Sequence, residues 1–391
     1  MQVQRGTVPR RGGSTFSGGT AVIYLDHSAT TPLSPAAWRA MEPYLKEHFG
    51  NPSEPHAAGR AARAGLDAAR ESVAATLGCA VGEVVFTGGG SEADNLAVLG
   101  RLASGGRVVA SAIEHPAVRE PLLAYRGEVA WAPVTADGVV DMAALAALVR
   151  PGDALCCVMG ANNVTGAIQP VDEIAALCAE RGVPLHVDAV QAAAGADVRA
   201  LPGASTIAIA AHKMGGPKGV GVLAGPGVAS LPAVVRGGGQ EHGLRPGTEN
   251  VAGAAALAAA LAERQGADAI VERHARAALR DRLEREAGLP VASAAARRLP
   301  GHALLLAGVR GDLVVHQLDG DGICVAAGSA CAAGSAEPSY VLAAMGIDPT
   351  TARGAVRVTL GPESDAAEVD AFLAAFRPAR AGLLRAVESL A

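Results

Sequence analysis

One stretch of the sequence, TIAIAAHKMGGP at residues 206–217, places a lysine between an apolar run and a glycine-proline turn. The run Thr206–Ala210 predicts a strand, and Lys213 follows close to its carboxyl end. In open α/β sheets such ends line the ligand crevice, where partial burial lowers the pKa of a lysine and lets its amine form a Schiff base. The alternative is an exposed loop lysine, the commoner place for this residue type. Lys46 and Lys218 are the only other lysines of the chain.

A second apolar run, Pro184–Asp188, ends in a carboxylate. Because the chain again reaches a strand end there, Asp188 is expected in the same crevice as Lys213. A pyridoxal phosphate site requires such a carboxylate, which keeps the pyridine nitrogen protonated so that the ring can absorb electrons. The alternative is that Asp188 caps the alanine-rich helical segment that follows.

A glycine run supplies the third part of such a site. Glu83–Thr87 predicts a strand, Ser91–Leu102 predicts a helix, and Gly88-Gly89-Gly90 joins them. Small residues at a helix start leave backbone N–H groups free for a phosphate. The alternative is a tight turn capped by Ser91. Together, the lysine, the aspartate and the glycine run indicate pyridoxal phosphate.

Two further residues lie where they could meet a ligand. His115 follows the apolar run Arg107–Ile113, and its ring could stack on an aromatic cofactor, although such histidines are more often structural. Arg357 lies inside the strand-like run Ala355–Leu360, where burial demands an anionic partner. Its guanidinium suits a substrate carboxylate, which it can bind through two parallel hydrogen bonds.

The chain holds six cysteines, and one of them differs from the rest in its surroundings. Cys331 lies among alanines, glycines and serines in residues 326–335, so we expect a mobile loop with an exposed thiol. The others lie in apolar segments typical of buried thiols, namely Cys79, Cys156, Cys157, Cys178 and Cys324. The sequence has no CxxC pair and no secretory signal, which favours reduced thiols in a cytoplasmic protein.

The composition excludes several classes of protein. Of the 391 residues, 50% are hydrophobic and 18% are charged, so disorder along most of the chain is excluded. The net charge of −5 requires no basic surface of the kind that neutralises nucleic-acid phosphates, and nucleic-acid binding is not expected. The long uncharged stretch Ala154–Val171 contains asparagines, a proline and glycines, so no membrane span is predicted.

The order of helical and apolar segments predicts an α/β fold with a large, mostly parallel sheet covered by helices on both faces. We predict a flexible extension at residues 1–20, a large cofactor-binding domain at 21–260 and a small C-terminal α/β domain at 261–391. Residues 35–46 and 57–77 are predicted as helices, 249–287 as one long helix and 233–236 as a short strand.

Several motifs, in this order, resemble those of pyridoxal-phosphate enzymes of the class V aminotransferase fold, and within that fold the cysteine desulfurases. They are YLDHSATTP at 24–32, GNPS at 50–53, SEADN at 91–95, HVD at 186–188, HK at 212–213, RPGT at 245–248, GSAC at 328–331 and EPS at 337–339. The similarity runs from about Tyr24 to Gly361 and implies that fold, with the cysteine loop in the smaller domain.

The resemblance also implies a role for individual residues. The catalytic residues would be Lys213, which holds the cofactor as a Schiff base, together with Cys331 and His115. The cofactor, pyridoxal 5'-phosphate, would be bound by Gly90, Ser91, His115, Asn163, Asp188, Gln191, His212, Lys213 and Thr248. The carboxylate of the substrate would be bound by Asn163 and Arg357, and no metal is implied.

Partners and reaction follow from the same resemblance. It implies a homodimer in which Thr248 reaches the phosphate in the neighbouring subunit. The Cys331 thiolate would attack the sulfur of L-cysteine, so that alanine leaves and a persulfide remains. The long loop of small residues is similar to the desulfurase branch that hands sulfur to separate acceptor proteins, for iron–sulfur cluster assembly or for thiolation.

The sequence departs from the family pattern at a few positions. Val164 stands where an Asn-Asn-Glu motif places glutamate, and Ala210-Ala211 stand where Ser-Gly usually precedes His-Lys. We expect cofactor binding to survive, with an altered environment around Asn163. The alternatives are a cystine or cysteine C–S lyase or a selenocysteine lyase on the same fold, which need no Cys331 thiol, and a silent scaffold, which would need no Lys213.

Overall fold

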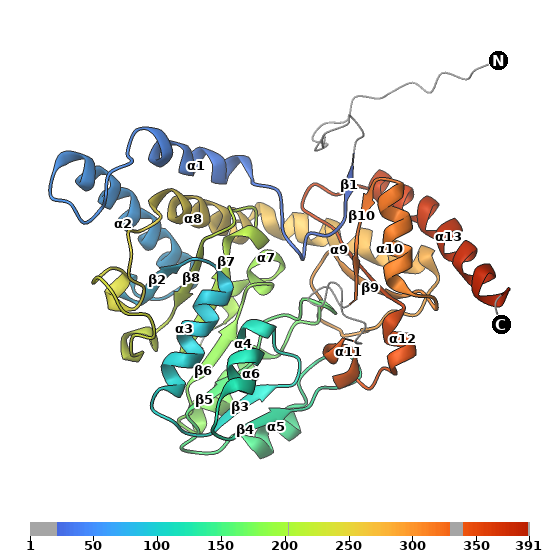
Figure 1. The fold of residues 1–391 in the computed structure, drawn as a ribbon, viewed down its shortest axis with the longest axis horizontal. Coiled ribbons are helices and arrows are strands. Elements are labelled where there is room, and N and C mark those ends of the chain that lie inside the picture. Colours follow the sequence, from blue (N-terminus) through green and yellow to red (C-terminus); the bar gives the residue numbers. More distant parts are fainter. Residues whose placement is uncertain (1–21, 202, 329–338, 390–391) are drawn as a thin grey trace.

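The computed structural model describes residues 22–201, 203–328 and 339–389. Its centre is a seven-stranded sheet with the strand order β2-β8-β7-β6-β5-β3-β4 (Figure 1). Only β8 runs antiparallel to its neighbours, so the predicted mostly parallel sheet is confirmed. The strands are β2 Val84–Thr87, β3 Val108–Ser111, β4 Val129–Ala132, β5 Leu155–Cys157, β6 Leu185–Asp188, β7 Thr206–Ala210 and β8 Gly221–Ala224.

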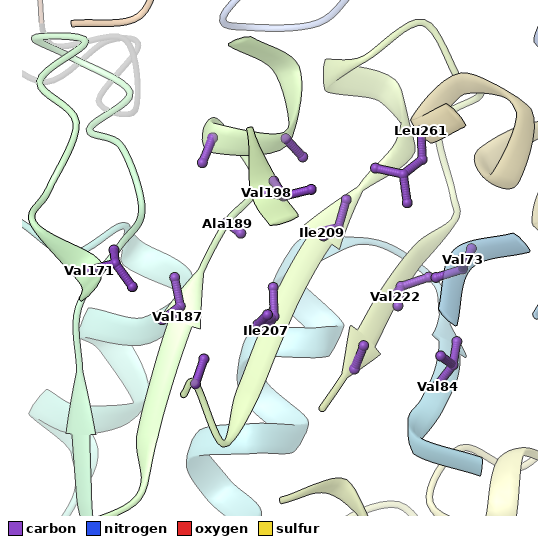
Figure 2. Packing of buried hydrophobic residues seen from close by; sticks show 14 of the residues in the cluster. Val73, Val84, Val171, Val187, Ala189, Val198, Ile207, Ile209, Val222 and Leu261 are labelled. Atoms are coloured by element: carbon purple, nitrogen blue, oxygen red, sulfur yellow. The ribbon is translucent and has the colours of Figure 1, made fainter. Parts of the chain in front are cut away.

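Helices cover both faces of this sheet, as predicted. Along β7, Ile207 and Ile209 pack on one face and Ala208 on the other, because successive side chains of a strand alternate. The first face is covered by α2 (Ala57–Leu77), α6 (Val171–Glu180) and α8 (Val251–Gln265), whose apolar residues interlock with the strands in Figure 2. The second face is covered by α3 (Gly90–Leu102) and α4 (Pro116–Ala124). Near the large sheet lie α5 (Met142–Leu148) and α7 (Ala192–Gly195), whereas α1 (Pro35–Lys46) packs on the outer side of α8.

A smaller sheet follows in the C-terminal part of the chain. It has the order β11-β12-β9, formed by Ala326–Ala327, Ala355–Thr359 and His302–Leu306, and it is antiparallel. Beside it, β1 (Ile23–Tyr24) pairs in parallel with β10 (Ile323–Cys324). The surrounding helices are α9 Asp268–Ala287, α10 Gly311–Gly320, α11 Tyr340–Ala344, α12 Pro349–Arg353 and α13 Ala366–Glu388. Residues of α13, α10 and these strands form a separate core.

Two predicted elements are wrong in detail. Residues 249–287 form two helices, α8 and α9, because Gly266 is extended (φ −71°, ψ 168°) and ends the first. Residues 233–236 form no strand; Val234 and Val235 are exposed and lie between Pro232 and a glycine run, with no strand pairing recorded for them in the described chain. The boundary drawn at residue 260 stays a prediction. Across the described residues, no helix combines the length and the apolarity that crossing a membrane requires.

Candidate active site

Lys213 lies just beyond the carboxyl end of β7, in a single 3-10 turn formed by Ala211–Lys213. Its Nζ donates to the backbone oxygens of Ser28, at 2.6 Å, and Ala29, at 2.9 Å. These oxygens belong to the segment that connects β1 with α1, so the amine sits between the large sheet and the N-terminal segment. A cavity of about 590 Å³ opens beside Lys213 and Ser28, which both line it.

Asp188 ends β6, the strand next to β7. The side chain is buried, and its Oδ1 accepts a hydrogen bond of 3.0 Å from the Val190 N–H. Burial raises the pKa of this carboxyl, while the nearby His115 and Lys213 oppose that rise. The structure therefore brings together Asp188, His115 and Lys213, three of the residues selected from the sequence. Gln191 is close as well, since its Nε2 donates to Ser28 O at 3.0 Å.

The start of α3 meets the ends of these strands. A Cβ on Gly90 would lie 2.6 Å from Val190 Cγ2 and 3.3 Å from the Ala210 Cβ, so only glycine allows this approach. Gly89, with φ +151°, precedes the helix and has no side chain to cap it. No side chain therefore caps α3. Its first-turn N–H groups lie near the carboxyl ends of the strands and can bind a phosphate.

The resemblance implies that His212 and Ser91 bind the cofactor together with Gly90. The His212 Nδ1 lies 3.1 Å from Thr30 Oγ1, and burial lowers the pKa of this histidine to about 4. The ring is therefore neutral near pH 7 in the protein alone. Ser91 is exposed.

His115 caps the N-terminus of α4. Its Nδ1 accepts a hydrogen bond of 3.1 Å from the Ala117 N–H, so in the neutral ring the proton is on Nε2. The preceding residue, Glu114, is fully buried, and its Oε1 accepts from Ser111 Oγ and from the Met159 N–H. Tyr340 Oη donates to the backbone oxygen of Glu114, which ties α11 to the His115 turn.

Three buried carboxyl groups, those of Asp94, Glu114 and Asp188, lie near one another. Burial raises the pKa of all three, to about 7 for Glu114 and well above the usual range for Asp94. Asp188 differs because Lys213 favours its ionised form. Asp94 is bonded to His186 (3.2 Å), a buried ring whose pKa burial lowers to about 4. Asp188 is thus the member of this cluster best placed to carry the negative charge.

Glu114→Gln is expected to change how stability depends on pH. The pKa of this carboxyl is 4.5 in the unfolded chain, and burial raises it to about 7 in the folded protein. Between these two pH values the folded state keeps the proton and the unfolded state does not. Stability of the wild type therefore falls through this window. Glutamine cannot ionise, so above the window the variant should be more stable than the wild type, by about 3 kcal/mol.

Urea unfolding of the cofactor-free proteins at about pH 5 and about pH 8 would measure this difference. Glu120→Gln changes an exposed residue of α4 and is the matched control. A stability difference between Glu114→Gln and wild type that does not grow with pH would contradict an ionisation of buried Glu114.

Arg357 in β12 is 2% exposed. Its Nη2 donates to Asp26 Oδ1 at 2.8 Å and its Nη1 to the backbone oxygen of Asn163 at 2.9 Å, while Nε is buried without a hydrogen-bond partner. Asp26 therefore supplies the anionic partner that burial of the guanidinium demands. The structure brings Arg357 to Asn163, which is also buried.

Thr248 is exposed, and two residues that precede it in the chain are anchored by ion pairs. Glu241 is buried and accepts two hydrogen bonds from the Arg70 guanidinium, at 2.6 and 2.8 Å. Arg245 Nε lies 3.1 Å from Glu92 Oε1 in the first turn of α3. The contact of Thr248 with a second subunit stays a prediction. Cys331 lies outside the described residues.

Several residues of the site were missed in the sequence. Asp26, whose carboxylate binds Arg357, and Ser28, whose backbone oxygen binds Lys213, lie in the quoted motif at 24–32. The charge of Asp26 after an apolar strand was the available signal, whereas a backbone contact such as that of Ser28 gives none. Glu114 had a weaker signal, a charge directly after an apolar run. His302, which contacts Ser28 and Val164, had no signal in the sequence, because no motif lies beside it.

Comparison with known proteins agrees with this geometry. The aminotransferase class-V family model matches residues 23–372. The chain is 41% identical to an IscS-like cysteine desulfurase of Mycobacterium tuberculosis, over 90% of this chain and 94% of the relative. It is 38% identical to the cysteine desulfurase IscS of Dictyoglomus turgidum, over 87% and 89%.

Solved structures give the same result. A NifS-like protein superposes with a TM-score of 0.84 at 29% identity, covering 93% of this chain and 99% of that one. DndA from Streptomyces lividans superposes with a TM-score of 0.72 at 30% identity, covering 86% and 99%.

Proposed function

Because the chain belongs to the aminotransferase class-V family, and within it to the cysteine desulfurases, we propose that it takes sulfur from L-cysteine and releases L-alanine. Pyridoxal 5'-phosphate is the proposed cofactor, and Cys331 is the proposed sulfur acceptor. One observation carries the proposal: Lys213, buried Asp188 and the uncapped start of α3 lie together at the carboxyl ends of the sheet strands.

The residues present fit this cofactor. A lysine amine suits its aldehyde, a buried carboxylate suits its pyridine nitrogen, and an uncapped helix start suits its phosphate. We assign these roles to Lys213, Asp188 and Gly90, with the remaining contacts from Ser91, His115, Asn163, Gln191, His212 and, across a dimer, Thr248. When bound, the cofactor supplies a carbonyl for the amino group of the substrate and a ring that accepts electrons.

The chain's own residues then act on the substrate. Arg357 and Asn163 bind its carboxylate, and Lys213 takes and returns a proton at the substrate carbon atoms. The Cys331 thiolate forms a bond to the substrate sulfur while the carbon–sulfur bond breaks. The electron pair of that bond stays on carbon, which gains a proton, so alanine leaves and the persulfide remains on Cys331.

The proposal includes partners. The enzyme is a homodimer in the cytoplasm, and a separate acceptor protein of iron–sulfur cluster assembly or of a thiolation pathway receives the sulfur. Support comes from the similarity to cysteine desulfurases along most of the chain.

Product analysis tests the proposed reaction. Cofactor-loaded protein is incubated with L-cysteine and a dithiol reductant, and alanine, sulfide, pyruvate and ammonia are quantified. Alanine and sulfide in equal amounts are expected. Pyruvate and ammonia instead would overturn the proposal and identify a C–S lyase.

A further inference from the structure

His302, the first residue of β9, joins two segments that are far apart in the sequence. Its ring is 2% exposed. The Nε2 lies 2.8 Å from the backbone oxygen of Val164, and the Nδ1 lies 3.2 Å from Ser28 Oγ. The same residue lines the cavity beside Lys213.

The chemistry of the two partners fixes the direction of both bonds. A carbonyl oxygen can only accept, so Nε2 carries the proton and donates to Val164. Burial and nearby arginines, of which Arg357 acts most strongly, lower the pKa of His302 to about 3, so the ring is neutral. The Nδ1 lone pair then accepts from the Ser28 hydroxyl. One neutral ring thus bridges the two segments.

Each bridged segment carries part of the active site. The backbone oxygen of Ser28 accepts from Lys213 Nζ and from Gln191 Nε2, and its N–H donates to Thr359 Oγ1 at 3.0 Å. Val164 directly follows Asn163, whose backbone oxygen accepts from Arg357. His302 therefore contacts two segments of the site. One contains Ser28, which binds Lys213, and the other contains Asn163, which binds Arg357.

The packing around the ring is specific. Gly166 has φ +75°, and a Cβ there would come within 2.7 Å of His302 Cβ and Cγ. A side chain at position 166 would therefore displace the imidazole. The Val164 side chain packs with Ile113 and Met159 in an apolar cluster, so Val164 meets His302 through its backbone oxygen.

We propose that His302 is a positioning residue that holds the Asn163–Val164 turn in register with Ser28, and so sets how well Arg357 and Asn163 bind the carboxylate of an amino-acid substrate. The inference rests on the proposed function for the assignment of those two residues to the carboxylate and for the cofactor whose absorbance reports binding. It predicts that loss of the bridge weakens binding of carboxylate-bearing amines and spares amines that lack the group.

The test compares L-alanine with ethylamine, which lacks the carboxylate, by the change each causes in the visible absorbance of the cofactor-loaded protein. His302→Leu removes both hydrogen bonds, and half-saturation by L-alanine should need about 10-fold more ligand, as expected for two modest bonds. Half-saturation by ethylamine should not change. His302→Gln, whose amide can donate to the Val164 oxygen, should recover most of the L-alanine binding.

Two further variants complete the test. Ser28→Ala removes only the Nδ1 partner and should act in the same direction with a smaller effect, which keeps the proposal testable if His302→Leu does not fold. His274→Leu changes an exposed histidine of α9 and should leave half-saturation by both ligands unchanged. Equal weakening of both ligands, or a lower thermal midpoint with unchanged binding, would overturn the proposal. Neither ligand donates sulfur, so this result is independent of whether L-cysteine gives alanine or pyruvate.

Discussion

Replacement of Lys213 by alanine is expected to abolish conversion of L-cysteine, with kcat lower by at least about 1000-fold, because the proposed function assigns to its amine both the attachment of the cofactor and the transfer of the proton. The structure offers no nearby substitute: Lys218 is exposed beyond the glycine-proline turn, and Lys46 lies at the end of α1 in an ion pair with Glu42. The visible absorbance of the loaded protein should change in the same variant.

A second variant separates the effect of the positive charge of Lys213 from that of its nucleophilic amine. Lys213→Arg keeps a cation that can donate to the Ser28 and Ala29 oxygens, but a guanidinium does not act as the nucleophilic amine. It should therefore be as inactive as alanine while unfolding at a higher temperature than the alanine variant. Lys218→Ala is the control and should keep full activity. Substantial turnover by Lys213→Ala would refute the assignment.

The second large effect is expected for Cys331→Ser. A serine hydroxyl does not ionise near neutral pH and does not accept sulfur, so alanine release should fall by at least about 100-fold while cofactor absorbance stays unchanged. Mass spectrometry of wild type after L-cysteine without reductant should find one added sulfur on the peptide that contains Cys331, and none in the variant.

The cysteines that the structure describes provide the control for Cys331→Ser. Cys79 and Cys324, which the sequence predicted as buried, are only partly buried, and this partial burial raises the pKa of their thiols. Cys156 and Cys157 lie fully buried in the strand β5, as predicted. The pKa of Cys178 is lowered by a hydrogen bond from Cys156, but this thiol is 1% exposed. Cys79→Ser is therefore a matched control and should keep wild-type alanine release. Full activity of Cys331→Ser would contradict the proposed acceptor.

Much of the fold was predictable because local patterns and tertiary burial agree. The helices at 35–46 and 57–77 and the strand Thr206–Ala210 have the predicted bounds, since their apolar spacing matches the faces they bury. The break at Gly266 was missed because alanine-rich sequence continues on both sides, although the low helix propensity of glycine was an available signal. The strand β4 and helix α4 were also not predicted.

The site divides in the same way. Lys213, Asp188 and Gly90 were found because each stands at the end of an apolar run, and parallel strands bring such ends together. The contacts that connect the rest of the site could not be predicted, since the hydrogen bonds of Ser28 with His302 and of Arg357 with Asp26 join distant parts of the chain. Burial of Glu114 depends equally on elements that pack around it.

The parallel pairing of β1 with β10 has a consequence for synthesis on the ribosome. The N-terminal strand emerges first, but it finds its place only when residues 323–324 have been made, and the neighbouring Ser28 N–H waits further for Thr359. A nascent chain that ends before that point contains Lys213, Asp188 and the Ser28 and Ala29 oxygens, but lacks the strand and the hydroxyl that fix the position of those oxygens. We therefore expect the lysine site to form late in folding, because it depends on contacts between distant parts of the chain.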